Sequence, residues 1–205
     1  MSALNKRVSF GEYVFDILDS VYEPSEDSTL FAENLFVQGG KVLDVGTGCG
    51  ILGILAAAKA DMVVATDVNP YAIDCARHNA RLNHVENKMA FVRGDLLTWL
   101  RFDAKFDLVL FNSPYLPVEE NQNLSWVERA WAGGKTGRVI IDRFISQVCG
   151  HVTRNGRVLM LQSTLSDVEE TLRAFEETKQ VARVIAERSL PFFETIKLIE
   201  ARPVT

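Results

Sequence analysis

The chain has few residues of the kinds that build zinc sites, disulfide frameworks or membrane spans. It contains three cysteines and three histidines, and no two cysteines have the Cys-x-x-Cys spacing of a structural zinc site. Scattered cysteines in odd number are typical of the reducing cytosol. No apolar run reaches the roughly 20 residues that cross a bilayer, and the N-terminus lacks the apolar segment of a signal peptide. The sequence therefore predicts a soluble, cytoplasmic protein with no metal site and no membrane contact.

A basic run is also missing. The formal net charge is −5, from 22 Lys and Arg against 27 Asp and Glu, and the longest basic cluster is Lys6-Arg7. Proteins that bind nucleic acid carry dense basic patches, because neutralising phosphates supplies much of their affinity. Nucleic acid is therefore a less favoured partner, although the charge does not exclude it.

Short apolar segments alternate with helical patterns, which is typical of an open, doubly wound, mostly parallel α/β sheet. Seven strands are expected, at residues 41–45, 62–66, 89–93, 106–111, 157–162, 182–187 and 195–200. Helices are expected after Pro24, at 51–59 and 70–82, briefly after Asp95, at 137–149, and from a Ser166 cap to residue 177. Asn155-Gly156 is expected to be a turn. Because no helix separates the last two strands, the C-terminal strand is predicted to be antiparallel. We expect one domain over residues 1–205, with the aperiodic residues 1–24 as an N-terminal extension.

A glycine loop follows the first expected strand, in the sequence VLDVGTGCG of residues 42–50. Its candidate ligand-binding residues are Asp44, Gly46, Thr47, Gly48 and Gly50. Ligands of such sheets lie beyond the carboxyl ends of the strands, where glycine lets the backbone approach them closely. A dinucleotide requires the spacing G-x-G-x-x-G and a P-loop ends in G-K-[ST], whereas this loop reads G-x-G-x-G. A tight turn without a ligand is the remaining alternative.

Acidic residues end the next two strands. Asp67 lies 21 residues after Gly46, where its carboxylate can accept from both hydroxyls of a ribose. Nicotinamide-binding folds share this feature, and a solvated turn residue is the alternative for Asp67. Asp95 ends the third strand at the level of an adenine ring, so its carboxylate can accept from the exocyclic amine while the Leu96 backbone serves a ring nitrogen.

The fourth strand ends in Asn112, Ser113, Pro114 and Tyr115. In isolation this sequence favours a strand-end turn. After the glycine loop and the two acidic strand ends, it indicates the place where a transferable group is presented.

Four segments together resemble the class I methyltransferases, and specifically the short HemK-like release-factor glutamine methyltransferases of archaea and eukaryotes. They are YEPSEDS at 22–28, DVGTGCG at 44–50, NSPY at 112–115 and AWAGGKTGR at 130–138. The glycine segment marks the superfamily, whereas the first and last segments at this spacing are far more specific. The match spans nearly the whole chain. It does not include the N-terminal helical domain that bacterial members use to hold their substrate.

The resemblance implies S-adenosylmethionine as the cofactor. It implies cofactor contacts from Ser28, Asp44, Gly46, Asp67, Asp95 and Asn112. It also implies that Asn112 and the following backbone carbonyl hold the reactive amine. The family has proline at the second position of NSPY, and this chain has Ser113, which predicts retained chemistry in a less rigid loop. The WAGG segment is either a surface loop or part of the substrate pocket, and Asp27 is either a helix N-terminal charge or a site residue.

The predicted chemistry is an in-line displacement on a sulfonium, which demands distance and alignment. An amide nitrogen is a poor nucleophile, because its lone pair is delocalised. Acceptors at the Asn112 side chain and the Ser113 carbonyl can hold both N–H bonds and stabilise the charge that develops on nitrogen. Tyr115 would pack against the planar amide, and neither a strong base nor a metal is needed.

The predicted function is N5-methylation of a glutamine in a translation termination factor, with N6-methylation of adenine in DNA or RNA as the alternative. A cofactor-binding scaffold without catalysis would need a disrupted NSPY loop. Related short members act with a small zinc-binding activator that pairs with the third strand. Here that strand would present residues 89–92 as an apolar edge, unless neighbours within the chain cover it.

Overall fold

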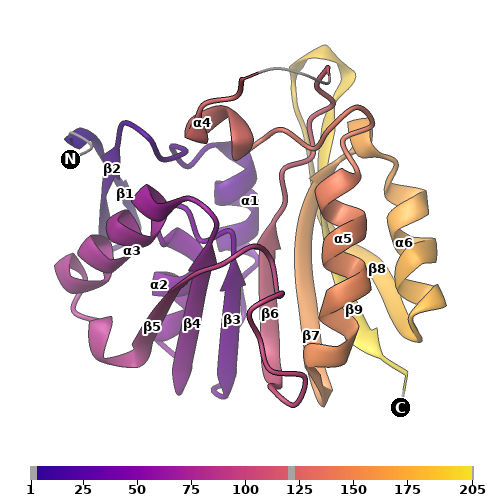
Figure 1. The fold of residues 1–205 in the computed structure, drawn as a ribbon, viewed down its shortest axis with the longest axis horizontal. Coiled ribbons are helices and arrows are strands. Elements are labelled where there is room, and N and C mark those ends of the chain that lie inside the picture. The colour runs from indigo at the N-terminus through magenta and orange to yellow at the C-terminus, as the bar shows by residue number, and fades with distance from the viewer. Residues whose placement is uncertain (1–3, 120–122, 205) are drawn as a thin grey trace.

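The computed structural model describes residues 4–119 and 123–204. A seven-stranded sheet with strand order β5-β4-β3-β6-β7-β9-β8 forms its centre (Figure 1). The strands are β3 (Lys41–Val45), β4 (Met62–Asp67), β5 (Met89–Arg93), β6 (Phe106–Asn112), β7 (Val152–Ser163), β8 (Gln180–Ser189) and β9 (Thr195–Pro203). The pairs from β5 to β7 are parallel, and β9 pairs antiparallel with both β7 and β8. The predicted α/β fold with an antiparallel C-terminal strand is confirmed.

Alternating side chains of the strands build a separate core on each face of the sheet. On β6, Leu108 and Leu110 belong to one core, whereas Val109 and Phe111 belong to the other. The first core is covered by α1 (Glu26–Glu33), α2 (Ile51–Ala57) and α3 (Pro70–Leu82). The second is covered by α5 (Val139–Val148) and α6 (Val168–Glu177), which lie in front of the sheet in Figure 1. The strand order reverses between β3 and β6, so the carboxyl ends of these two strands form the switch point.

The segment before residue 24 forms a hairpin of β1 (Leu4–Phe10) and β2 (Tyr13–Leu18). Phe15 and Ile17 of β2 are buried in the first core. The free side of β2 forms hydrogen bonds with two asparagine side chains, one in α3 and one at its C-cap. Asn79 accepts from the Asp16 amide at 2.8 Å and donates to its carbonyl at 3.0 Å, and Asn83 pairs in the same way with Val14. The chain leaving the hairpin is thereby directed past α3 toward the carboxyl edge of the sheet.

Two helix predictions need correction. The predicted short helix after Asp95 is absent from the described residues between β5 and β6. Leu96 there has a φ of 49°, and a left-handed residue interrupts a right-handed helix. The predicted Ser166 cap is also wrong, because Asp167 is the N-cap of α6 and accepts from the Glu170 amide at 3.0 Å.

Two further boundaries differ. Asn155-Gly156 does not precede a strand but lies inside β7, where the register against β6 shifts, as in a β-bulge. The helix expected from Gly137 begins at Val139, because Gly137 has a φ of 73°. A short helix, α4 (Trp126–Arg129), precedes it and begins with a capping box between Ser125 and Glu128.

No helix among the described residues has the length and apolarity to cross a membrane.

Candidate functional site

A cavity of about 570 Å³ lies over the carboxyl ends of β3, β4 and β6. All but one of the residues predicted to form the site line it; these are Ser28, Asp44, Gly46, Thr47, Gly48, Asp67, Asp95, Leu96, Asn112, Ser113, Pro114 and Tyr115. Gly50 is the exception. It is the N-cap of α2 with a φ of 90°, and a Cβ there would lie 3.1 Å from Ala76 of α3. Gly50 therefore permits close packing of α2 on α3 and does not line the cavity.

Asp44 organises the inner wall of the glycine loop. One of its oxygens accepts from the Thr47 hydroxyl at 2.6 Å and from the Gly53 amide at 3.0 Å. The carboxyl is 1% exposed, and this burial raises its pKa to about 7. Gly46 and Gly48 bend the loop around it with φ values of 65° and 57°, which other residues rarely adopt.

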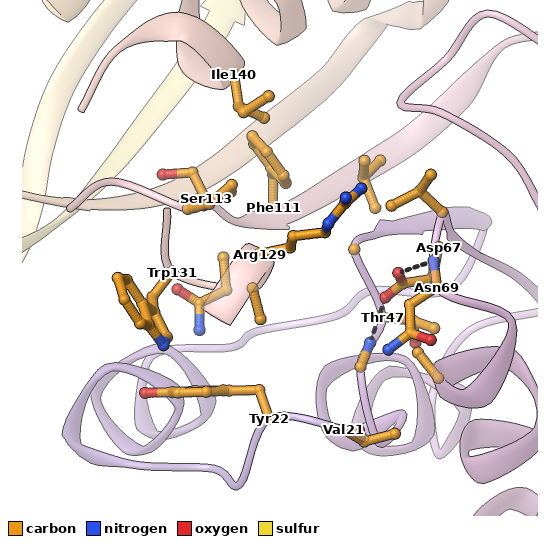
Figure 2. Close-up of a pocket in the computed structure, with 18 of the residues that line it drawn as sticks. Val21, Tyr22, Thr47, Asp67, Asn69, Phe111, Ser113, Arg129, Trp131 and Ile140 are labelled. Atoms are coloured by element: carbon orange, nitrogen blue, oxygen red, sulfur yellow. Dashed lines mark hydrogen bonds between the residues drawn. The ribbon is translucent and has the colours of Figure 1, made fainter. Parts of the chain in front are cut away.

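Asp67 holds the outer side of the same loop. Its two oxygens accept from the amides of Gly48, at 3.0 Å, and Asn69, at 2.9 Å (Figure 2). Burial raises the pKa of this carboxyl above its ordinary value. A carboxylate oxygen has two lone pairs, so each can accept a further bond from a ligand hydroxyl.

Asp95 lies at the end of the cavity beyond β5. Its carboxylate forms an ion pair with Arg143 of α5 at 2.6 Å, and both residues line the cavity. Both side chains are about half exposed, so solvent screens this pair. The chain turns here at Leu96, whose carbonyl accepts from the Trp99 indole at 2.9 Å. Sequence reasoning gave no indication of Arg143.

Two residues that line the cavity, Thr66 and Asn112, each carry a buried side-chain oxygen without a partner among the described residues, and Asn112 is the one at the end of β6. Its side-chain nitrogen donates to Asp27 at 3.2 Å, and Ser28 Oγ lies 3.5 Å away. Its side-chain oxygen is buried and accepts no hydrogen bond from any residue that the structure describes. Most buried acceptors in folded proteins are paired. An unpaired buried oxygen in a cavity therefore indicates that a bound ligand donates a hydrogen bond to it.

Asp27 fixes the direction of that amide. If the amide were reversed, its oxygen would face the Asp27 carboxylate, and two acceptors would repel each other. Asp27 is 7% exposed, and its other oxygen accepts from the Ser28 amide and hydroxyl. Tyr22 completes the group, since its hydroxyl lies 3.4 Å from Asp27 and burial raises its pKa. Asp27 therefore lies in the first turn of α1 and also lines the cavity, where it contacts Asn112.

Ser113 is attached firmly to β7. Its amide donates to the Leu161 carbonyl at 3.3 Å, and its hydroxyl donates to the same oxygen at 2.6 Å. A proline could make neither bond, because it has no N–H and no hydroxyl. Nothing in the sequence indicated these two bonds, which constrain the backbone at Ser113 in a different way from a proline ring. The expectation of a less rigid loop stays a prediction.

The WAGG segment borders the cavity. Trp131 and Ala132 line it, and Leu116 forms a parallel bridge with Ala132. Glycine is required nearby, because a Cβ on Gly137 would lie 2.3 Å from the Tyr115 carbonyl. The backbone after NSPY is thus held against WAGG. Figure 2 shows Trp131 and Tyr22 near each other on the side of the cavity away from Asp67.

The strand order, the glycine loop at the switch point and the cavity above it define a Rossmann-like methyltransferase. Residues 20–186 match the model of the family described as methyltransferase small domain. The chain belongs to this family.

Individual proteins that are similar to this chain include glutamine and termination-factor methyltransferases. A Methanocaldococcus jannaschii protein assigned as a protein N5-glutamine methyltransferase is 40% identical over 85% of this chain and 88% of its own length. Human methyltransferase HEMK2 is 32% identical over 75% of this chain and 76% of its own. A solved structure, the E. cuniculi Mtq2–Trm112 complex responsible for methylation of the eRF1 translation termination factor, aligns with a TM-score of 0.71 and 27% identity, covering 90% of this chain and 99% of that one.

Proposed function

We propose that this protein transfers a methyl group from S-adenosylmethionine to the side-chain amide nitrogen of a glutamine in a translation termination factor, in the cytoplasm. The observation that carries the proposal is the free, buried oxygen of Asn112 at the end of β6. The relatives that share most of the chain support the same acceptor, since their names specify protein glutamine or termination-factor methylation.

The residues on the glycine-loop side fit the cofactor. Asp67 offers lone pairs to ribose hydroxyls, Asp95 stands where an adenine amine can donate, and Asp44 is on β3, which pairs with the strand that carries Asn112. Gly46 and Gly48 leave their side of the cavity free of Cβ atoms. When bound, S-adenosylmethionine supplies an electrophilic methyl group carried on a sulfonium.

Asn112 and Ser113 orient the acceptor. The free Asn112 oxygen accepts one N–H of the glutamine amide, and the Ser113 carbonyl accepts the other. Both N–H bonds are then held in one plane, so the nitrogen lone pair projects perpendicular to it; as the new C–N bond forms, the nitrogen releases one of its two protons to solvent and the product is a neutral N-methyl amide. The two oxygens also stabilise the positive charge that grows on nitrogen during transfer. Because Asp27 accepts from Asn112, it increases the negative charge on the Asn112 oxygen.

Aromatic side chains form the walls around this acceptor. Tyr22, Tyr115 and Trp131 line the cavity, and burial raises the pKa of both tyrosine hydroxyls, so they stay neutral. Flat, neutral walls suit a planar amide and exclude water. The backbone that follows Tyr115 is held by the WAGG segment, because the Leu116 amide donates to the Trp131 carbonyl and the Gly133 amide donates to the Leu116 carbonyl, both at 2.8 Å.

The same pair of acceptors would suit the planar amine of adenine, so the two substrates need a direct test. We would offer the purified protein labelled S-adenosylmethionine with either a termination factor or adenine-containing oligonucleotides. Methyl incorporation into the glutamine of the factor, and none into the oligonucleotides, is the expected result. Incorporation into adenine alone would overturn the proposal.

We also propose that a small activator subunit pairs with β5. This strand is an edge of the sheet, and its residues from Met89 to Val92 are partly exposed. An unpaired edge offers backbone groups to a partner strand. The complex of Mtq2 with Trm112 supports this proposal, because the aligned protein was solved with a second subunit.

A further inference from the structure

Two phenylalanines are displayed in solvent at the turn between β8 and β9. Phe192 and Phe193 are 96% and 103% exposed. Each has a φ of 63°, in the left-handed region that bulky side chains rarely adopt. Strained residues of this kind cluster at binding and active sites, and adjacent exposed aromatic rings are characteristic of interaction surfaces.

The turn lies at the edge of the sheet that holds the carboxyl ends of the parallel strands, where the cavity is also found. Thr195, which starts β9, donates to the Thr164 hydroxyl at 3.1 Å, just beyond the end of β7. Burial and the charge of Asp27 raise the pKa of the Tyr22 and Tyr115 hydroxyls, which both line the cavity, and the charge of Glu194 adds to both shifts. In Figure 1 the turn is at the top, at the same edge of the sheet as the carboxyl ends of β3 and β6.

The position of the turn is fixed relative to the acceptor side of the cavity. Arg188, at the end of β8, forms ion pairs with Glu26 at 2.8 Å and Glu33 at 2.7 Å, both on α1. The turn is closed by the Leu190 amide, which donates to the Glu194 carbonyl at 2.8 Å. Because α1 also carries Asp27, the same helix holds both the turn with its two rings and a residue that contacts Asn112.

We propose that Phe192 and Phe193 dock the polypeptide surface that surrounds the methylated glutamine of the termination factor. This inference rests on the proposed function. A glutamine side chain that reaches Asn112 leaves its own backbone at the rim, so the surrounding protein must cover the rim residues. The acidic Glu194 and the net charge of −5 favour an apolar protein surface over nucleic acid as the occupant.

The test compares an intact termination factor with a short peptide containing the same glutamine, using the full chain and labelled S-adenosylmethionine. The double variant Phe192→Ser/Phe193→Ser should raise the KM for the factor about tenfold or more, because truncated aromatic anchors are the usual hot spots. Its kcat for the factor, and its kinetics with the peptide, should match those of the wild type. Phe192→Leu/Phe193→Leu should recover part of the lost affinity.

Phe102→Ser is the matched control, since Phe102 is 88% exposed and precedes β6, at the opposite edge of the sheet from the cavity. It should leave every parameter unchanged. An unchanged KM for the factor in the double variant would overturn the docking proposal while leaving the proposed function intact. Equal losses with factor and peptide would overturn it too, by showing an effect on the cavity itself. A wild-type protein that methylates oligonucleotides instead, and loses this activity in the double variant, would overturn both proposals.

Discussion

The two sides of the cavity differ in how their polar groups are satisfied. On the glycine-loop side, Asp44 and Asp67 each accept two hydrogen bonds, one from the loop and one from the start of a neighbouring helix. On the acceptor side, Asn112 has a donor group that is paired and an oxygen that is not. The carboxylates of the first side are therefore already paired, although the buried Thr66 hydroxyl on that side has no hydrogen-bond partner among the described residues. The second is incomplete until a donor arrives.

The two sides also differ in the distance along the chain between their parts. Thr47 and Gly53 lie within ten residues of Asp44, whereas Asp27 and Asn112 are 85 residues apart. We therefore expect changes on the glycine-loop side to act on cofactor affinity and on folding. Changes on the acceptor side should act on the rate of transfer.

The largest expected effect follows from Asn112→Ala. Removing one preorganised contact to developing charge costs about 10²–10³ in rate elsewhere, and we expect a similar loss here. Cofactor affinity should fall much less, because Asp67, Asp95 and the glycine loop remain. Single-turnover methylation at saturating cofactor measures the rate, and calorimetry measures the affinity. A rate within about threefold of wild type would show that other groups hold the amine. Asn112→Asp adds a second carboxylate beside Asp27, and activity of this variant on adenine would favour the alternative substrate.

The next effect concerns pH and the carboxyl of Asp44. Its pKa is about 7 in the folded protein because it is buried, and near 4 in the unfolded chain. Between these values the folded state holds a proton that the unfolded state has lost, so stability falls as the pH rises through this window. Asp44→Asn should raise the stability of the ligand-free protein at pH 8 by on the order of 2–4 kcal/mol, with the gain shrinking toward pH 4.

Denaturant unfolding of the two proteins at several pH values measures this difference. A gain that does not depend on pH would show that the carboxyl does not titrate in this window.

A smaller effect is expected from Asp67→Ala. Losing a charged acceptor costs about 1.5–3 kcal/mol, which is roughly a 10- to 150-fold weaker affinity for S-adenosylmethionine. The exposed Asp103, which pairs with Arg101, provides a control, and Asp103→Ala should bind normally. Calorimetry compares the two variants. Tight binding of NAD by the wild type, with no binding of S-adenosylmethionine, would refute the assignment of the cofactor.

The smallest effect on the isolated chain is expected at the β5 edge. Phe91 packs against the first core beneath Arg77, so a charge there would disturb folding as well as pairing. Val92 belongs to neither core and is partly exposed. Val92→Glu should change the free energy of unfolding by no more than about 0.5 kcal/mol, yet it should abolish co-purification with an activator subunit.

The matched control for Val92→Glu lies on the other edge of the sheet. Val181 of β8 is 61% exposed, and Val181→Glu should leave co-purification unchanged. If an activator co-purified equally with both variants, this would show that it does not bind at β5.

The difference between the two sides also explains what the sequence could predict. The order of strands and the glycine loop follow from local patterns, so the fold and the residues around Asp44 and Asp67 were accessible. The segments YEPSEDS and WAGG were noticed, but their roles stayed open because Asp27 and Trp131 acquire them from contacts far along the chain. Arg143 had no signal at all, since a charged residue on a half-exposed helix is ordinary. The short helix predicted after Asp95 failed for a related reason, because the left-handed Leu96 is set by its tertiary surroundings.

The central claim is that Asp27 acts through Asn112 by fixing the direction of its amide. A double-mutant cycle with Asp27→Asn, Asn112→Ala and the combined variant, measured by single-turnover methylation of a termination factor at saturating cofactor, tests it directly. An asparagine at position 27 can accept or donate, so the amide of Asn112 is no longer held in one orientation, and we expect a slower rate. We expect the combined variant to be no slower than Asn112→Ala alone. Losses that multiply would contradict it, because they would mean that Asp27 and Asn112 act independently.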